Sequence, residues 1–300
     1  MDARTRALVK VNTEDVLAAI GWQNTRLRRW LAAALLRGPA LRFAREMTAF
    51  DDEVARRGIR AAAAGLLASF VRRLDVHGIG GIPPTGPALL LSNHPGMTDT
   101  LVLLSAIPRD DLLIIAAERP FLTALPAAAA SLILLPDQRE RRLPALRRAV
   151  GHLAAGGALL TFPAGEIEPD PDALPGAAAA VRRWSASSLS FLKRAPDCVV
   201  VPLIVRGVLQ PRAQRNPLAR LRQRRADRER LAAMLQVLVH ELAPGAWRTH
   251  VTLEVLPPMS AAGLLSRGPA AHDALTAVVA EHLRRRARAR PGSSAPAHRR

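Results

Sequence analysis

The chain of 300 residues has a single cysteine, no tyrosine and only 3% aromatic residues. One cysteine can form neither an internal disulfide nor a thiolate metal cluster, and the apolar run 198–201 predicts a core position for Cys198. The lack of disulfides is typical of a reducing, cytoplasmic setting. Because aromatic side chains are few, alanine, leucine and valine must fill the core of a protein that is 49% hydrophobic.

Long apolar runs are absent as well. We find no stretch of about 18 consecutive apolar residues, the length that a membrane-spanning helix needs. Residues 1–14 are charged and lack the apolar centre of a secretory signal. We therefore expect a cytoplasmic protein whose contact with a membrane is peripheral.

Lysine occurs only at positions 10 and 193, so almost all positive charge comes from arginine. A GC-rich genome explains the exchange of lysine for arginine, but not the formal net charge of +18. That charge indicates an anionic partner: nucleic acid, anionic lipid or a phosphate-bearing cofactor. The basic stretches contain no aromatic stacking residues and no recognisable nucleic-acid module, so we expect no nucleic-acid partner.

The distribution of apolar residues divides the chain into three parts. Residues 1–73 have helical spacing and predict a helical N-terminal region, which either caps the core or supplies interfacial helices. Residues 74–283 alternate short apolar runs with helical segments, which predicts an α/β domain with a mixed, mostly parallel sheet covered by helices. Residues 284–300 are rich in arginine, proline, serine and alanine and predict a disordered basic tail.

The predicted strands are 74–79, 88–92, 112–116, 131–135, 158–162, 199–205 and 251–256, and the predicted helices between them are 99–106, 143–155, 177–194 and 218–242. Arginines are dense over 212–230. This basic stretch is either a solvated helix face, a surface for anionic lipid, or a docking site for an acidic acyl carrier protein or for CoA phosphates.

The sharpest local feature is the segment 89–99, which reads Leu-Leu-Leu-Ser-Asn-His-Pro-Gly-Met-Thr-Asp. It predicts a strand that ends at His94, a Pro-Gly turn, and a helix that begins near Asp99, the place where open α/β sheets carry functional residues. His94 can accept a proton from an alcohol near neutral pH, and Asp99 can fix its tautomer and stabilise the imidazolium. The alternative is that Asp99 only caps a helix.

Two more segments have a distinctive form. Residues 158–166 predict a strand that ends abruptly in Phe-Pro-Ala-Gly-Glu, and residues 199–205 predict an apolar strand interrupted by Pro202. With the segment 93–99, their order and spacing over 74–258 resemble the PlsC-like glycerolipid acyltransferase family, which includes glycerol-3-phosphate and lysophosphatidate acyltransferases. Residues 93–99 resemble its Asn-His-x4-Asp block and residues 162–165 its Phe-Pro-Glu-Gly block.

The resemblance implies an O-acyltransferase with His94 as general base and Asp99 as its partner. It would move a fatty acyl group from an acyl-CoA or acyl carrier protein thioester, with no further cofactor, to the hydroxyl of a phospholipid, lysophospholipid or related glycerolipid. Backbone N–H groups near Gly165 would stabilise the oxyanion. We expect the protein on the anionic inner face of the cell membrane. The implied substrate-binding residues are Asn93, Gly96, Arg139, Phe162, Pro163, Gly165, Glu166 and Pro202.

The sequence departs from the family pattern at two positions. Ala164 stands where the family has an acceptor-binding Glu, and the next acid is Glu166. Gln138 stands at the usual Arg position, with Arg139 one residue later. These departures favour an acceptor other than glycerol-3-phosphate. A catalytically silent lipid-binding protein and a hydrolase that uses water in the same site remain alternatives, and no residue spacing predicts a metal site.

Overall fold

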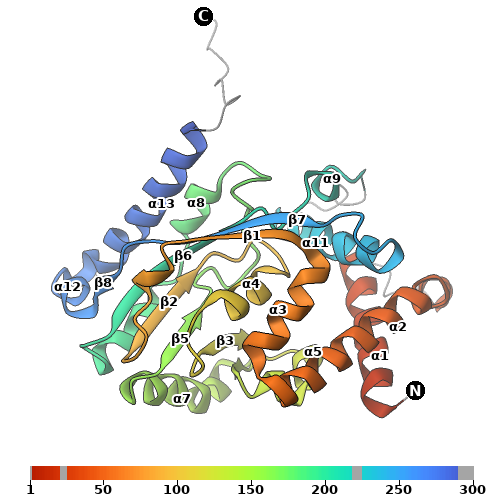
Figure 1. The fold of residues 1–300 in the computed structure, drawn as a ribbon, viewed down its shortest axis with the longest axis horizontal. Helices are drawn as coiled ribbons and strands as arrows, with labels where there is room; N and C mark the ends of the chain where they lie inside the picture. The colour runs from red at the N-terminus through yellow and green to blue at the C-terminus, as the bar shows by residue number, and fades with distance from the viewer. Residues whose placement is uncertain (1, 21–25, 218–224, 290–300) are drawn as a thin grey trace, which may run out of the picture.

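The computed structural model describes residues 2–20, 26–217 and 225–289 (Figure 1). Among these residues, one eight-stranded sheet forms the centre of the molecule, with the order β1-β7-β6-β2-β5-β3-β4 and β8 paired to β6. The strands are β1 (Val71–His77), β2 (Ala88–Ser92), β3 (Leu113–Ala117), β4 (Leu132–Leu135), β5 (Ala158–Thr161), β6 (Val199–Arg206), β7 (Thr249–Val255) and β8 (Met259–Ser260).

All neighbouring pairs in the sheet are parallel except β6–β7 and β6–β8. Every residue of β2 and β5 is buried, because helices cover both faces of a sheet of this kind. Each predicted strand is present, with ends that lie within about three residues of the predicted ones. The predicted mixed, mostly parallel sheet covered by helices is confirmed.

Helices cover the two faces of the sheet in separate layers. Leu90 and Leu160 pack on one face with residues of α3 and α4, and Leu89 and Leu159 pack on the other face with residues of α7, α8, α12 and α13. The helices of the α/β part are α4 (Asp99–Ala106), α5 (Pro120–Thr123), α6 (Pro126–Ala129), α7 (Leu143–Ala154), α8 (Ala177–Val181), α9 (Pro211–Gln214), α11 (Arg225–Leu242), α12 (Ala261–Leu265) and α13 (Ala271–Ala289). Short 3-10 helices are η1 (Ile79–Gly81), η2 (Arg139–Arg142), η3 (Ala186–Arg194) and η4 (Gly268–Ala270).

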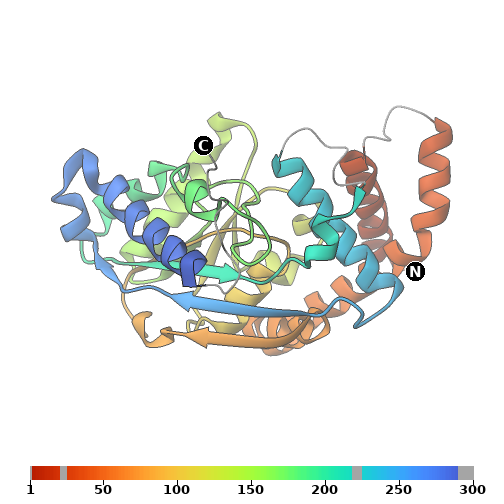
Figure 2. The same cartoon turned by 90° about the horizontal axis from the view of Figure 1, so that it is seen from above.

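The N-terminal helices α1 (Ala3–Ile20) and α2 (Arg26–Arg57) lie at one end of the molecule, and α12 and α13 lie at the other (Figures 1 and 2). Helix α3 (Ile59–Phe70) lies between them, on one face of the sheet. Buried residues of α1, α2 and α3 form a third core cluster with Leu125 and Ala128 beside the sheet. Helix α2 runs through Pro39 without ending there. No helix in the described ranges is long and apolar enough to cross a membrane.

Two predicted segments differ from the structure. The helix predicted over 177–194 is divided into α8 and η3, because Ser185 turns the chain and its Oγ accepts the N–H of Ser187, a bond that competes with a continuous helix. The tail predicted to be disordered from residue 284 is helical to Ala289, because Arg284 and Arg285 pair with Glu281 one turn earlier. Residues 218–224 of the basic stretch and 290–300 lie outside the described residues.

Candidate active site

The carboxyl end of β2 holds the predicted catalytic histidine in place. β2 ends at Ser92, and the Asn93 side chain then continues the pairing with β6: its Nδ2 donates to the Val205 carbonyl and its Oδ1 accepts the Val205 N–H, both at 2.8 Å. Asn93 is buried, so these bonds are shielded from water. The backbone is therefore fixed one residue before His94 leaves the sheet.

His94 and Asp99 form the predicted pair. His94 Nδ1 lies 2.8 Å from Asp99 Oδ2, which also accepts the Gly96 N–H at 3.0 Å, and Asp99 is fully buried at the start of α4. The His94 side chain is 27% exposed, which leaves its ring accessible. Burial lowers the pKa of His94, but Asp99 and then Glu168 raise it, so the net pKa is above 6.5.

Glu168 is a second acid at this pair, and it was not among the predicted site residues. Its Oε2 accepts the His94 N–H at 3.0 Å, while its own N–H donates to the His94 carbonyl at 2.7 Å. Trp184 Nε1 donates to the other carboxylate oxygen at 2.9 Å. Burial raises the pKa of Glu168 to about 7, although Trp184 and the His94 N–H both lower it. The loop after β5 is thus bound to His94 through its backbone.

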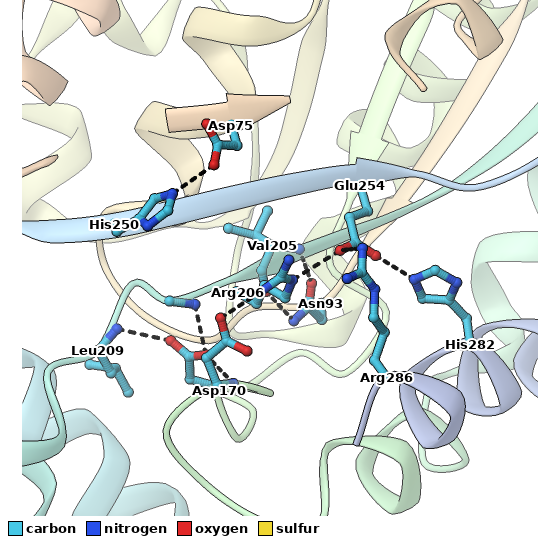
Figure 3. A network of polar contacts seen from close by, with 12 residues as sticks. Asp75, Asn93, Asp170, Val205, Arg206, Leu209, His250, Glu254, His282 and Arg286 are labelled. Carbon is cyan, nitrogen blue, oxygen red and sulfur yellow. Dashed lines mark hydrogen bonds and ion pairs between the residues drawn. The ribbon is translucent and has the colours of Figure 1, made fainter. Parts of the chain in front are cut away.

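A buried polar network holds this loop against the end of β6 (Figure 3). Asp170 accepts the N–H groups of Gly207 and Leu209, both at 2.9 Å, and Arg206 donates to Asp172 at 2.8 Å and to Glu254 at 2.9 Å. On its other side, Glu254 also pairs with His282 and Arg286 of α13. These hydrogen bonds and ion pairs fix the loop that carries Glu168 relative to the ends of β6 and β7.

His94 lines an apolar cavity of about 770 Å³. The cavity walls come from α2, α3 and α4, from β3 and β4, and from the 120–128 segment, with side chains such as Phe43, Phe50, Leu104 and Phe121. The rings of His94 and Phe162 lie 4.6 Å apart, so Phe162 covers the histidine within this cavity. A volume of this size and lining suits an alkyl chain more than a polar metabolite.

Thr98 adds a polar group to the cavity wall. Thr98 precedes α4, but its hydroxyl makes no capping hydrogen bond. The residue is 6% exposed, and its Oγ1 has no hydrogen-bond partner among the described residues. In contrast, the N–H of Gly165, near which oxyanion donors were predicted, already donates to the Phe162 carbonyl at 3.1 Å.

The cavity collects only some of the residues predicted to bind substrate. Phe162, Pro163 and Gly165 line it. The side chain of Asn93 is bonded to β6, Gly96 packs against Val208 and Leu209, and Pro202 is buried in β6; these three residues support the sheet and the turn and do not line the cavity. Glu166 and Arg139 are exposed and also lie outside it.

Two other arginines occupy the place expected of Arg139. Arg119 and Arg142 line the cavity together with Asp137. Arg139 lies in η2 with an exposed side chain and does not line the cavity. Arg142 donates to the carbonyls of Pro136 and Asp137, and Arg119 pairs with the Asp137 carboxylate at 3.2 Å. The cations at the cavity therefore follow β3 and end η2. They are not Arg139, the neighbour of Gln138 that the sequence predicted for this role.

A histidine bonded to a carboxylate beside an alkyl-sized cavity has the geometry that acyl transfer needs. Residues 73–206, which contain His94, Asp99 and Glu168, match the family model described as Acyltransferase. The chain therefore contains an acyltransferase domain, which confirms the predicted class of enzyme.

A comparison with solved structures aligns the chain with the 1-acyl-sn-glycerophosphate (LPA) acyltransferase PlsC from Thermotoga maritima. The alignment has a TM-score of 0.43 and 16% sequence identity, and it covers 94% of this chain and 92% of that chain. A search of curated proteins found no match to the sequence.

Proposed function

We propose that this acyltransferase moves a fatty acyl group from an acyl-CoA or acyl carrier protein thioester to the hydroxyl of a lysophospholipid or related glycerolipid. The observation that carries the proposal is the His94–Asp99 pair on the wall of the apolar cavity. An acyl chain in this cavity would bring its thioester carbonyl to the polar end that His94 and Thr98 line. No enzyme nucleophile is needed, because the acceptor hydroxyl attacks directly.

The proton follows a simple route in this mechanism. Asp99 holds the proton of His94 on Nδ1, which leaves Nε2 free to accept the proton of the acceptor hydroxyl. The acceptor oxygen attacks the thioester carbonyl, and the C–S bond then breaks as the ester forms. The imidazolium returns its proton to the departing thiolate, so His94 ends neutral. Glu168 acts as a positioning residue because it binds the His94 backbone.

Thr98 is our candidate for stabilising the tetrahedral intermediate. Its buried hydroxyl lines the same cavity as His94 and lacks a partner within the described ranges, so a negative oxygen in the cavity would satisfy it. A water molecule in the cavity could also accept a hydrogen bond from this hydroxyl, but it would not carry the negative charge of the intermediate. Arg119 and Arg142 at the cavity favour an acceptor that carries a negative charge, such as the phosphate of a lyso-lipid.

The proposal is tested by measuring thioester consumption by wild type and by His94→Ala. The donors are acyl-CoA and acyl carrier protein thioesters, the acceptors are a panel of lyso-lipids, and products are detected by mass spectrometry. We expect an acceptor-dependent ester that is lost in His94→Ala, while His152→Ala, a change at a histidine on α7 bonded to the Ala158 carbonyl, keeps it. Thioester loss without an acylated lipid would support the hydrolase. Equal turnover in both proteins would support the silent lipid-binding alternative and contradict the proposal.

We further propose that the cavity opens toward an anionic membrane surface. Met97 and Leu146 line the cavity and are 44% and 36% exposed, and Arg119 beside them is also exposed. Apolar side chains flanked by arginines are typical of an interfacial surface. Arg119→Glu changes the local charge by two units and should weaken binding to anionic vesicles roughly 30-fold, because each unit contributes about 1 kcal/mol. Arg267→Glu, at the opposite end of the molecule, should not weaken it. Equal binding by both variants would contradict this orientation.

A further inference from the structure

A second cluster of ionisable side chains lies outside the active site, between α2 and α11. Glu46 of α2 and His240 and Glu241 of α11 place one ligand atom each within 4.8 Å of one another. The two helices pack against each other at the N-terminal end of the molecule (Figure 1). Glu46 is far in the sequence from His240 and Glu241, so residue spacing gave no sign of the cluster.

The carboxylates of this cluster are poorly compensated. Glu241 is only 7% exposed, and its Oε1, like Oε2 of Glu46, is buried without a hydrogen-bond partner in the described part of the chain. The nearby cations lie at ion-pair distance from the other two oxygens: Arg42 Nε is 3.9 Å from Glu241 Oε2, and His240 Nε2 is 3.9 Å from Glu46 Oε1. Burial, and next the charge of Glu46, raise the pKa of Glu241 to about 7. A buried acid beside a half-buried one, each with one unpartnered oxygen, is stabilised by a cation or a proton between them.

We propose that Glu46, His240 and Glu241 bind one divalent transition-metal ion, with Zn²⁺ as the best match, and that this ion fastens α2 to α11. An imidazole nitrogen with two carboxylates is a donor set that zinc accepts, while the imidazole disfavours Mg²⁺ and Ca²⁺. The unpartnered oxygens of Glu46 and Glu241 supply the lone pairs, and a water molecule would complete a tetrahedral site.

The surroundings of the cluster orient its ligands. Ser69 donates a hydrogen bond of 3.3 Å to Glu46, and the ring of Phe70 packs on the ring of His240 with centroids 4.1 Å apart. Contacts of this kind fix the ligands of metal sites before the ion binds. Met47, next to Glu46, and Val237, one turn before Glu241, both line the active-site cavity. The ion would therefore hold one wall of that cavity without touching the reacting atoms.

Zinc binding to full-length protein tests the proposal independently of transferase activity. Protein stripped with chelator is titrated with Zn²⁺ in competition with a chromophoric chelator, and bound metal is counted by mass spectrometry. We expect one Zn²⁺ per chain, a rise in Tm on binding, and little response to Mg²⁺. His240→Ala and Glu241→Gln should each weaken binding at least tenfold, by the loss of one of three ligands.

His250→Ala is the matched control, because His250 and Asp75 form an exposed histidine–carboxylate pair that a surface-bound ion could use. This variant should bind Zn²⁺ like wild type. Glu241→Gln removes a buried charge, so its metal-free form should keep at least the wild-type Tm and remain folded. No zinc binding by wild type, or equal binding by wild type, His240→Ala and Glu241→Gln, would overturn the site. In the first case Glu46 and Glu241 share a proton instead.

Discussion

Replacing Asp99 with asparagine removes the charge that orients and activates His94, and changes few other contacts. The Gly96 N–H and His94 Nδ1 both contact the same oxygen, Asp99 Oδ2, at 3.0 and 2.8 Å, so the new carboxamide can place only one of its two ends there. With its oxygen there it keeps both contacts but has no negative charge to stabilise the imidazolium. With its NH₂ group there it loses the Gly96 N–H and donates to His94 Nδ1, so the imidazole carries its proton on Nε2 and cannot accept one from the acceptor.

The expected loss is large, because an orienting carboxylate contributes roughly 10⁴ to kcat, or about 5 kcal/mol of transition-state stabilisation. The pH profile adds a second signature. In wild type Asp99 holds the pKa of His94 above 6.5 against the effect of burial, so kcat/KM should rise with pH through a midpoint above 6.5. Without the carboxylate, burial dominates, and the midpoint of the residual activity should move to lower pH.

The assay is initial-rate thioester consumption with the best lyso-lipid acceptor between pH 5 and 9. Asp110→Asn makes the same chemical change at a side chain that is 95% exposed, and should leave rate and profile unchanged. Tm and far-UV circular dichroism check that Asp99→Asn is folded. A folded Asp99→Asn enzyme within tenfold of the wild-type rate, or with an unshifted midpoint, would refute the role assigned to Asp99.

Three further outcomes are expected. Ala128→Phe adds a large side chain to the cavity wall at α6. For long acyl donors kcat/KM should fall about fourfold for each methylene that no longer fits, because burying one methylene contributes about 0.8 kcal/mol. An unchanged dependence on chain length would place the acyl chain elsewhere. Thr98→Val should lower kcat about 10²-fold with little change in KM, and an unaltered kcat would remove Thr98 as an oxyanion donor. Glu168 keeps its proton in the folded state up to about pH 7, whereas the unfolded chain releases it near 4.5, so wild-type stability falls as pH rises through this window. Thermal unfolding should therefore show Glu168→Gln gaining about 3 kcal/mol relative to wild type between pH 4.5 and 7, and a pH-independent difference would contradict the raised pKa.

The strands and the catalytic pair could be predicted because local sequence determines them. Apolar runs such as 88–92 and 158–161 are buried on both faces, so composition alone identified them. The five-residue interval between His94 and Asp99 spans one turn, and the structure closes it with a single hydrogen bond. The choice of a catalytic role over a helix cap depended in addition on the downstream segments 158–166 and 199–205.

The remaining site residues depend on burial, which local sequence does not give. Glu166, Glu168 and Asp170 alternate along one loop; Glu166 is exposed, while Glu168 and Asp170 are buried and bonded to strand ends. In an irregular loop, this spacing does not tell which acid is buried or which one contacts His94. The metal-binding cluster proposed between α2 and α11 depends in the same way on helix packing that no sequence interval encodes.

The side chain of Asn93 substitutes for a peptide unit. A carboxamide has one N–H face and one carbonyl, so it reproduces the donor and acceptor of a backbone amide, and Val205 is paired as if β2 had one more residue. The main chain is thereby released from the sheet at the point where the histidine must turn toward the cavity. An aspartate there would lack the donor, and a glutamine would be one carbon too long. The position of the proposed general base is thus set by a side chain that does not line the cavity.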